Sequence, residues 1–267
     1  MEYVKSVRSA LRPRTLFASA CPVLITVSLL YKSHNVSFLQ LDALAALGCA
    51  VLTQLLGNLS AVYSQLPAHT AAQTAGNRRR QDHPQFAIAD ASGMALLATF
   101  ALIYCRRGEE PLPMVGLREV VVAWAVGPVA MLSTSVYLIG EVPWAVVLYA
   151  YLVMLFAWAF LILESARDVP FARRMGRSDT SLALRLGFQW SFQGFLLLMV
   201  SFYGMLLVLG IAMGHLGNFL LVVTIAKLKD ISEDFRVEKL NHLPDKFARL
   251  ASFLGVGLII SILAGLS

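Results

Sequence analysis

Residues 143–164 read PWAVVLYAYLVMLFAWAFLILE, a continuous run of mostly apolar side chains. A helix of this length covers about 33 Å at 1.5 Å per residue, enough to cross the roughly 30 Å hydrocarbon core of a bilayer. Further apolar stretches of about this length occur at 15–31, 41–63, 119–139, 187–210, 211–227 and 249–266. The sequence therefore predicts an all-α integral membrane protein with seven transmembrane spans.

The composition of the chain agrees with this prediction. Of its 267 residues, 58% are hydrophobic and 14% are charged, and the mean hydropathy is +0.69. Soluble domains contain about 25% charged residues. The net charge of +6 does not by itself indicate an acidic partner, because Lys and Arg in loops are the usual mark of the cytoplasmic or matrix face of a membrane protein. We expect no nucleic-acid partner.

Segment 86–105 is ambiguous as a further span, because Asp90 interrupts it and the remaining apolar part is only about 21 Å long as a helix. The basic N-terminal arm, the Arg78–Arg80 loop and the basic loop at 165–186 share one side of the membrane only if this segment does not cross. We therefore favour seven spans plus one partial helix, or eight helices if the segment crosses. Residues 227–243 are charged and are predicted to form a surface connection.

The chain shows no convincing internal repeat, and we expect one domain over residues 1–267. We expect the basic loops to lie on the cytoplasmic side of a bacterial membrane, or on the matrix side of a mitochondrial inner membrane.

Two polar stretches that follow apolar helices carry the candidate functional residues, namely residues 58–65 (NLSAVYSQ) and 167–173 (RDVPFAR). Ions at the end of an apolar helix usually need a partner. Asp168 is therefore interpreted as the ion-pair partner of Arg167 or Arg173, with a role as a metal ligand as the alternative. Asn58 is expected to hydrogen-bond to a neighbouring helix, since an unsatisfied amide in an apolar helix is costly.

Arg12 and Arg14 precede the first apolar stretch. Two interpretations stay open for them. They could bind a diphosphate or the carboxylate of an acceptor, whereas a basic N-terminal arm is more often a topology anchor.

These motifs resemble those of the UbiA superfamily of intramembrane prenyltransferases, and its 1,4-dihydroxy-2-naphthoate polyprenyltransferase branch in particular. The resemblance is carried by residues 11–16 (LRPRTL), 52–59 (LTQLLGNL), 115–119 (VGLRE), 167–168 (RD) and 183–187 (ALRLG). It implies a barrel of nine helices around a lipid-open cavity, in which two aspartate-rich loops chelate Mg²⁺ on a polyprenyl diphosphate and an aromatic acceptor attacks the allylic cation. This chain has only a short polar segment where the family carries one of these helices, so we expect a barrel with one helix fewer.

The acidic ligands of the first family motif are absent. Where the family reads N-L-x-N-D-Y-x-D, residues 58–65 keep the first asparagine and Tyr63. The second asparagine and both aspartates are replaced by Ala61, Val62 and Gln65.

The second family motif, N-N-L-R-D-x-x-x-D-R, keeps both arginines and one aspartate, as Arg167, Asp168 and Arg173. Its two asparagines and its second aspartate are replaced by Glu164, Ser165 and Ala172. Only one of the four aspartates therefore remains, although Glu119 keeps an acid where a further family motif has one. Mg²⁺ prefers carboxylate and phosphate oxygens, so this loss bears directly on metal binding.

Two hypotheses follow, of which we favour the first. The chain is a catalytically degenerate UbiA-type protein that binds a membrane lipid, isoprenoid or quinone in its central cavity, or serves with protein partners in a membrane assembly, and it needs no cofactor. Alternatively, it is an active Mg²⁺-dependent prenyltransferase of the kind used in menaquinone or ubiquinone biosynthesis. The candidate catalytic residues are Asp168, Glu164 and Glu119, with Asp168 as the metal ligand. The candidate substrate-binding residues are Arg12, Arg14, Asn58, Tyr63, Arg167 and Arg173.

Overall fold

The computed structural model describes residues 13–65, 117–174, 183, 187–240 and 242–265. Within these residues the chain forms helices and no strand. In chain order they are α2 (Pro13–His34), α3 (Leu41–Gln65), α5 (Leu117–Trp124), a π-helical turn η1 (Ala125–Val129), α6 (Ala130–Ile139), α7 (Trp144–Arg174), α9 (Phe188–Ala212), α10 (Gly217–Leu221), a 3₁₀ turn η2 (Val222–Thr224), α11 (Ile225–Arg236) and α12 (Leu243–Ala264).

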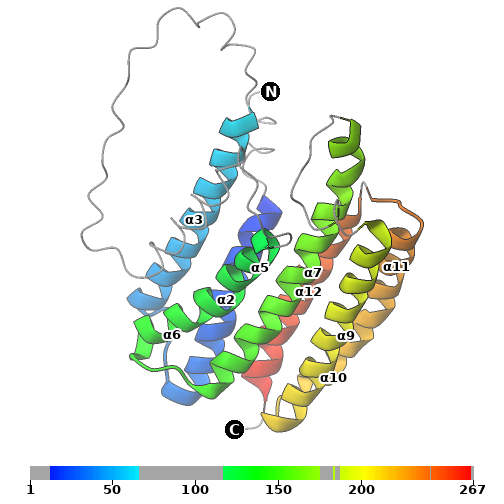
Figure 1. Cartoon of the computed structure of the whole chain (residues 1–267). Coiled ribbons are helices and arrows are strands. Elements are labelled where there is room, and N and C mark those ends of the chain that lie inside the picture. Colours follow the sequence, from blue (N-terminus) through cyan, green and yellow to red (C-terminus); the bar gives the residue numbers. More distant parts are fainter. Residues whose placement is uncertain (1–12, 66–116, 175–182, 184–186, 241, 266–267) are drawn as a thin grey trace, which may run out of the picture.

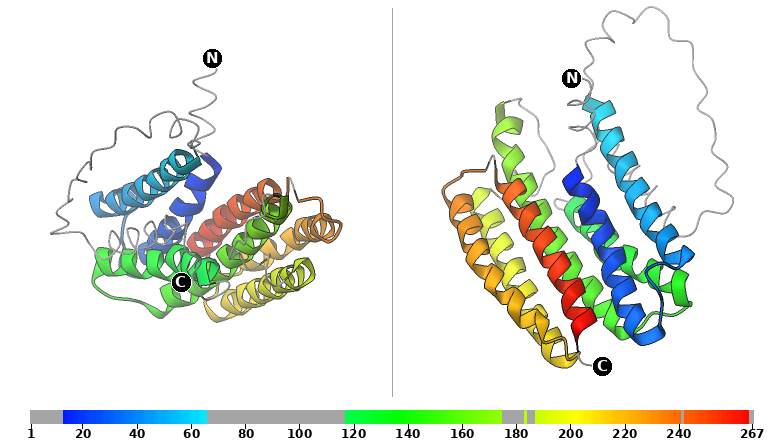
Figure 2. Two further views of the ribbon diagram at one scale, coloured as in Figure 1. Left: turned by 45° about the horizontal axis from the view of Figure 1, so that its top comes forward. Right: turned by 180° about the vertical axis from the view of Figure 1, so that it is seen from behind.

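The helices run alternately up and down and form a curved array, with α3 at one edge and the α9 and α11 pair at the other (Figures 1 and 2). Helix α7 packs against α9 and α5, and α2 packs against α12, α3 and α6. The start of α2, the end of α3, the start of α5 and the end of α7 lie toward one end of the array, called here the polar end. Tight turns at 35–40, 140–143 and 213–216 lie at the other, called here the turn end.

The predicted all-α membrane fold is confirmed. Among the described residues, four helical segments are long and apolar enough to span a membrane: Glu119–Ile139, Trp144–Arg167, Phe188–Ala212 and Leu243–Ala264. Helices also cover the predicted spans at 15–31 and 41–63. Segment 86–105 lies outside the described residues, so its crossing stays a prediction, as does the extent of the single domain.

Large apolar side chains on the outer faces of the helices support a lipid environment. Leu197, Val200 and Ile211 of α9 are 68%, 70% and 72% exposed. Trp190, in the first turn of α9, and Trp144, in the first turn of α7, are also exposed and lie at opposite ends of the array. Tryptophan at both ends of a helical bundle is typical of the two membrane–water interfaces.

The predicted span at 211–227 and the predicted connection at 227–243 are both corrected by the structure. Helix α9 continues through Ala212, the chain turns at Gly214 with φ +68°, and the next helix starts at Gly217. The predicted boundary between the two spans, at 210/211, falls before this turn, because the residues on both sides of it are apolar and hydropathy does not locate the turn. A positive φ is a backbone conformation that glycine adopts without steric cost.

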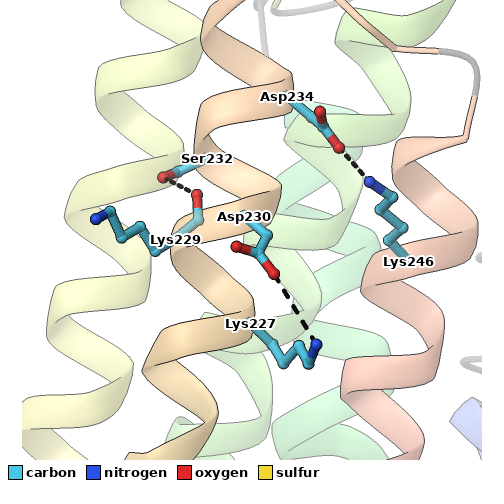
Figure 3. A network of polar contacts seen from close by, with 6 residues as sticks. All are labelled: Lys227, Lys229, Asp230, Ser232, Asp234 and Lys246. Atoms are coloured by element: carbon cyan, nitrogen blue, oxygen red, sulfur yellow. Dashed lines mark hydrogen bonds and ion pairs between the residues drawn. The ribbon is translucent and has the colours of Figure 1, made fainter.

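Helix α11 replaces the predicted connection because one of its faces is apolar. Phe235 is fully buried, and its ring lies 5.3 to 5.5 Å from three phenylalanine rings of α9. The opposite face carries the ion pair Lys229–Glu233. Figure 3 shows two further ion pairs of this helix, Lys227–Asp230 and the pair of Asp234 with Lys246 of α12. This amphipathic pattern is that of a helix covering the core with one face and meeting water with the other.

Candidate functional site

Two of the predicted site regions meet at the polar end. Glu119 lies in the first turn of α5, which packs against α7, and is only 6% exposed. Its Oε1 accepts a hydrogen bond from Ser165 Oγ at 3.3 Å. Ser165 stands at an asparagine position of the second family motif. The structure thus joins this motif to the one around Glu119 across 46 residues of chain.

Glu164 and Arg167 form the second described contact of this region. The Arg167 Nη2 atom lies 3.7 Å from Glu164 Oε1, and the two side chains are 35% and 34% exposed. An ion pair with this exposure contributes at most about 1 kcal/mol. The pair nevertheless gives the Glu164 carboxylate a cation of the protein, Arg167, as its neighbour.

The other predicted site residues are described only in part. Asn58 and Tyr63 belong to the last turns of α3, and Asp168 and Arg173 to the last turns of α7, so these backbones approach the polar end. Arg14 lies in the first turn of α2. Their side chains, and the whole of Arg12, lie outside the described residues. The predicted pairing of Asp168 with Arg167 or Arg173 therefore stays a prediction.

Within the side chains that the structure describes, no group of three or more His, Cys, Asp or Glu residues is positioned to hold a metal ion. The side chain of Asp168 lies outside those described. The described carboxylates of the polar end, Glu119 and Glu164, each have a protein partner instead.

A second polar cluster, which the sequence did not predict, lies buried toward the turn end. It consists of Tyr149, His215, Asn218 and Ser261, all 6% exposed or less. Tyr149 Oη lies 2.6 Å from His215 Nδ1, Asn218 Nδ2 donates to Tyr149 Oη at 3.3 Å, and Ser261 Oγ donates to Asn218 Oδ1 at 2.7 Å. These residues belong to α7, the 213–216 turn, α10 and α12.

The signal for this cluster was present but weak. Asn218 and Ser261 are polar residues in apolar helices, where an unpaired amide or hydroxyl is costly, so each requires a partner. The sequence cannot say which partner, because Tyr149 and Ser261 are 112 positions apart by their numbering.

Comparison with known proteins supports the resemblance. No family model matches this chain. The chain is 25% identical over 287 residues to the UbiA prenyltransferase domain-containing protein 1 homolog of Drosophila melanogaster, and the alignment covers 97% of this chain and 79% of that protein. Together with the all-helical architecture, this similarity supports membership of the UbiA superfamily of membrane proteins.

Proposed function

We propose that this chain is a catalytically degenerate UbiA-type protein, which keeps the helical fold to bind an isoprenoid or quinone lipid and has lost the metal–diphosphate chemistry. The observation that carries the proposal is the replacement of three motif aspartates by Val62, Gln65 and Ala172. A divalent cation that neutralises a leaving diphosphate needs several oxygen ligands around it. These three replacements supply no anionic oxygen.

The contacts at the polar end support the same proposal. Glu119 is hydrogen-bonded to Ser165 and Glu164 faces Arg167, so each carboxylate already has a protein partner. Recruiting them to a metal would first break these contacts. Arginines can attract a diphosphate, but they do not provide the Lewis acid that assists its departure.

The proposal implies a preference among ligands. An apolar chain gains about 0.8 kcal/mol for each buried CH₂ group, whether or not it carries a diphosphate. Without a bound metal, the charged diphosphate adds a desolvation cost that a neutral headgroup avoids. A neutral polyprenyl quinone should therefore bind at least as tightly as the corresponding polyprenyl diphosphate, and Mg²⁺ should change neither affinity.

The test compares the purified chain in detergent with a variant in which the acids are restored, Val62→Asp/Gln65→Asp/Ala172→Asp. The matched control carries Asn at the same three positions, which has a similar size and no charge. We expect Mg²⁺ to strengthen polyprenyl diphosphate binding only in the Asp variant. Mg²⁺-dependent binding of the diphosphate by the unmodified chain would refute the proposal.

An active Mg²⁺-dependent prenyltransferase is the second candidate, and it has its own support. The similarity to a protein named for a UbiA prenyltransferase domain covers 97% of this chain. In addition, Asp168 is retained on α7 one turn after Ser165, the partner of Glu119. This candidate requires that Mg²⁺ with a diphosphate analogue raises the melting temperature, and that Asp168→Ala removes the effect.

If the chain is catalytically degenerate, it could also serve as a structural component of a membrane assembly instead of binding a lipid. Its test is purification of the tagged chain from its native membrane in mild detergent. Stoichiometric co-purification of the same partner proteins, retained in Asp168→Ala, would support it, and a monodisperse monomer would count against it.

A further inference from the structure

A shallow pocket of about 280 Å³ lies at the turn end, away from the family motifs. Its walls include Leu29, Met213 and Ile262, which are apolar, and its polar lining consists of Lys32, Ser33 and His215. These residues come from the last turns of α2, the turn between α9 and α10, and the last turn of α12. Because these helices all end here, the pocket lies where the bundle meets a membrane–water interface.

The buried network behind the pocket fixes the orientation of the Asn218 amide. Leu206 O can only accept a hydrogen bond, and it lies 3.3 Å from Asn218 Nδ2. The amide nitrogen therefore faces Leu206 and Tyr149, and the amide oxygen accepts from Ser261. In this orientation both amide N–H groups and the amide oxygen of Asn218 have hydrogen-bond partners.

The orientation of Asn218 favours one tautomer of His215. Tyr149 Oη accepts a hydrogen bond from Asn218 Nδ2, and its own hydroxyl is then available to donate to His215 Nδ1 at 2.6 Å. Nδ1 then acts as an acceptor, and the proton of the neutral imidazole lies on Nε2. Burial, and secondly the charge of Lys32, lower the pKa of His215 below its ordinary value, which keeps the ring neutral.

Lys32 supplies the charge of the pocket. Its ammonium donates one hydrogen bond to Gly265 O at the end of α12. An ammonium has three donors, so two remain. Among the described residues no carboxylate forms an ion pair with Lys32, and the acids at this end, Asp42 and Glu141, lie in exposed positions.

We propose that the turn-end pocket binds a phosphate-type oxyanion, with the ammonium of Lys32 and the Nε2–H of His215 as donors and the apolar wall against the adjoining acyl chain of a phospholipid. Lysine is a common phosphate ligand that acts as a point charge, and hydrogen bonds to a charged group are stronger than neutral ones. The site lies at the opposite end of the array from the family motifs. It does not depend on the proposed function.

The test uses the full chain in detergent after delipidation, titrated with dioctanoyl phosphatidylglycerol and, separately, with inorganic phosphate. Ser33→Asp places a carboxylate at the exposed rim of the pocket, and Lys32→Gln removes the cation. Ser37→Asp is the matched control, because it makes the same charge change in the exposed turn after α2 and does not line the pocket.

We expect the phospholipid to bind saturably and to raise the melting temperature. Loss of a charge-assisted hydrogen bond should weaken binding at least about tenfold in Lys32→Gln, and Ser33→Asp should act similarly, while Ser37→Asp binds like the unmodified chain. Saturable binding of inorganic phosphate with the same pattern would support the site with free phosphate as its ligand. Equal affinity in Ser33→Asp and Ser37→Asp, or no saturable binding of either probe, would overturn the proposal.

Discussion

Replacing Gly127 by alanine tests how tightly the helices pack at the centre of the array. Gly127 lies in the π-helical turn η1, where the chain from α5 to α6 passes against α7. A Cβ atom at this position would lie 2.7 Å from Met154 N, 2.8 Å from Ala150 O and 2.9 Å from Met154 Cα. All three are backbone atoms of α7, so no side-chain rotation relieves the overlap.

The matched control is Gly204→Ala in α9, where a Cβ would meet no atom within 4 Å. Within a helix, alanine stabilises the folded state by about 1 kcal/mol relative to glycine, and this contribution cancels when the two variants are compared. What remains is the cost of overpacking, about 1 to 3 kcal/mol. For a chain of this size, that cost corresponds to a melting temperature roughly 2 to 12 °C lower in Gly127→Ala than in Gly204→Ala.

The assay is thermal unfolding of both variants in the same detergent, at one scan rate, followed by intrinsic fluorescence. A lower midpoint in Gly127→Ala supports the close approach of η1 to α7. If the two variants unfold together, or Gly127→Ala is the more stable, the packing described here is wrong.

Three further predictions concern polar groups. Because the pKa of His215 is lowered, the unfolded chain takes up a proton near pH 6.5 and the folded chain only at a lower pH. The free energy of unfolding should therefore be full above pH 6.5 and fall below it by up to about 1.4 kcal/mol per pH unit, and His215→Gln should flatten the melting-temperature profile. Asn218→Leu should cost about 2 to 3 kcal/mol in a denaturation assay, with Ser232→Ala as a near-neutral exposed control. The hydrogen bond from Lys246 lowers the pKa of Asp234, so Lys246→Gln should raise that pKa in an NMR titration, and an unchanged value would contradict the ion pair.

Much of the fold could be predicted from the sequence because a helix that crosses a bilayer must be both apolar and long. The runs that became α2, α3, α7, α9 and α12 satisfy both requirements on their own. The turn at Gly214 could not be located this way, because hydropathy does not change across it. Helix α11 was missed because its charged face dominates the composition, while only Ile231 and Phe235 are buried on its other face.

The Glu119–Ser165 contact at the polar end and the buried cluster at the turn end could be predicted from the sequence to different extents. The meeting of Glu119 with Ser165 was implied only by the family resemblance, since nothing local pairs residues 46 positions apart. The network around His215 has no motif, because its members come from elements that only tertiary packing brings together. Single polar residues in apolar helices predict that a partner exists, but their identity depends on helix packing.

The most direct test of the degenerate-site proposal is a prenyl-transfer assay. The purified chain is incubated with Mg²⁺, a polyprenyl diphosphate and a dihydroxynaphthoate-type acceptor, beside an active UbiA prenyltransferase in the same detergent. Loss of three carboxylates predicts no prenylated product from this chain. Product formed at a rate comparable to that of the active enzyme, and abolished by a chelator, would contradict it.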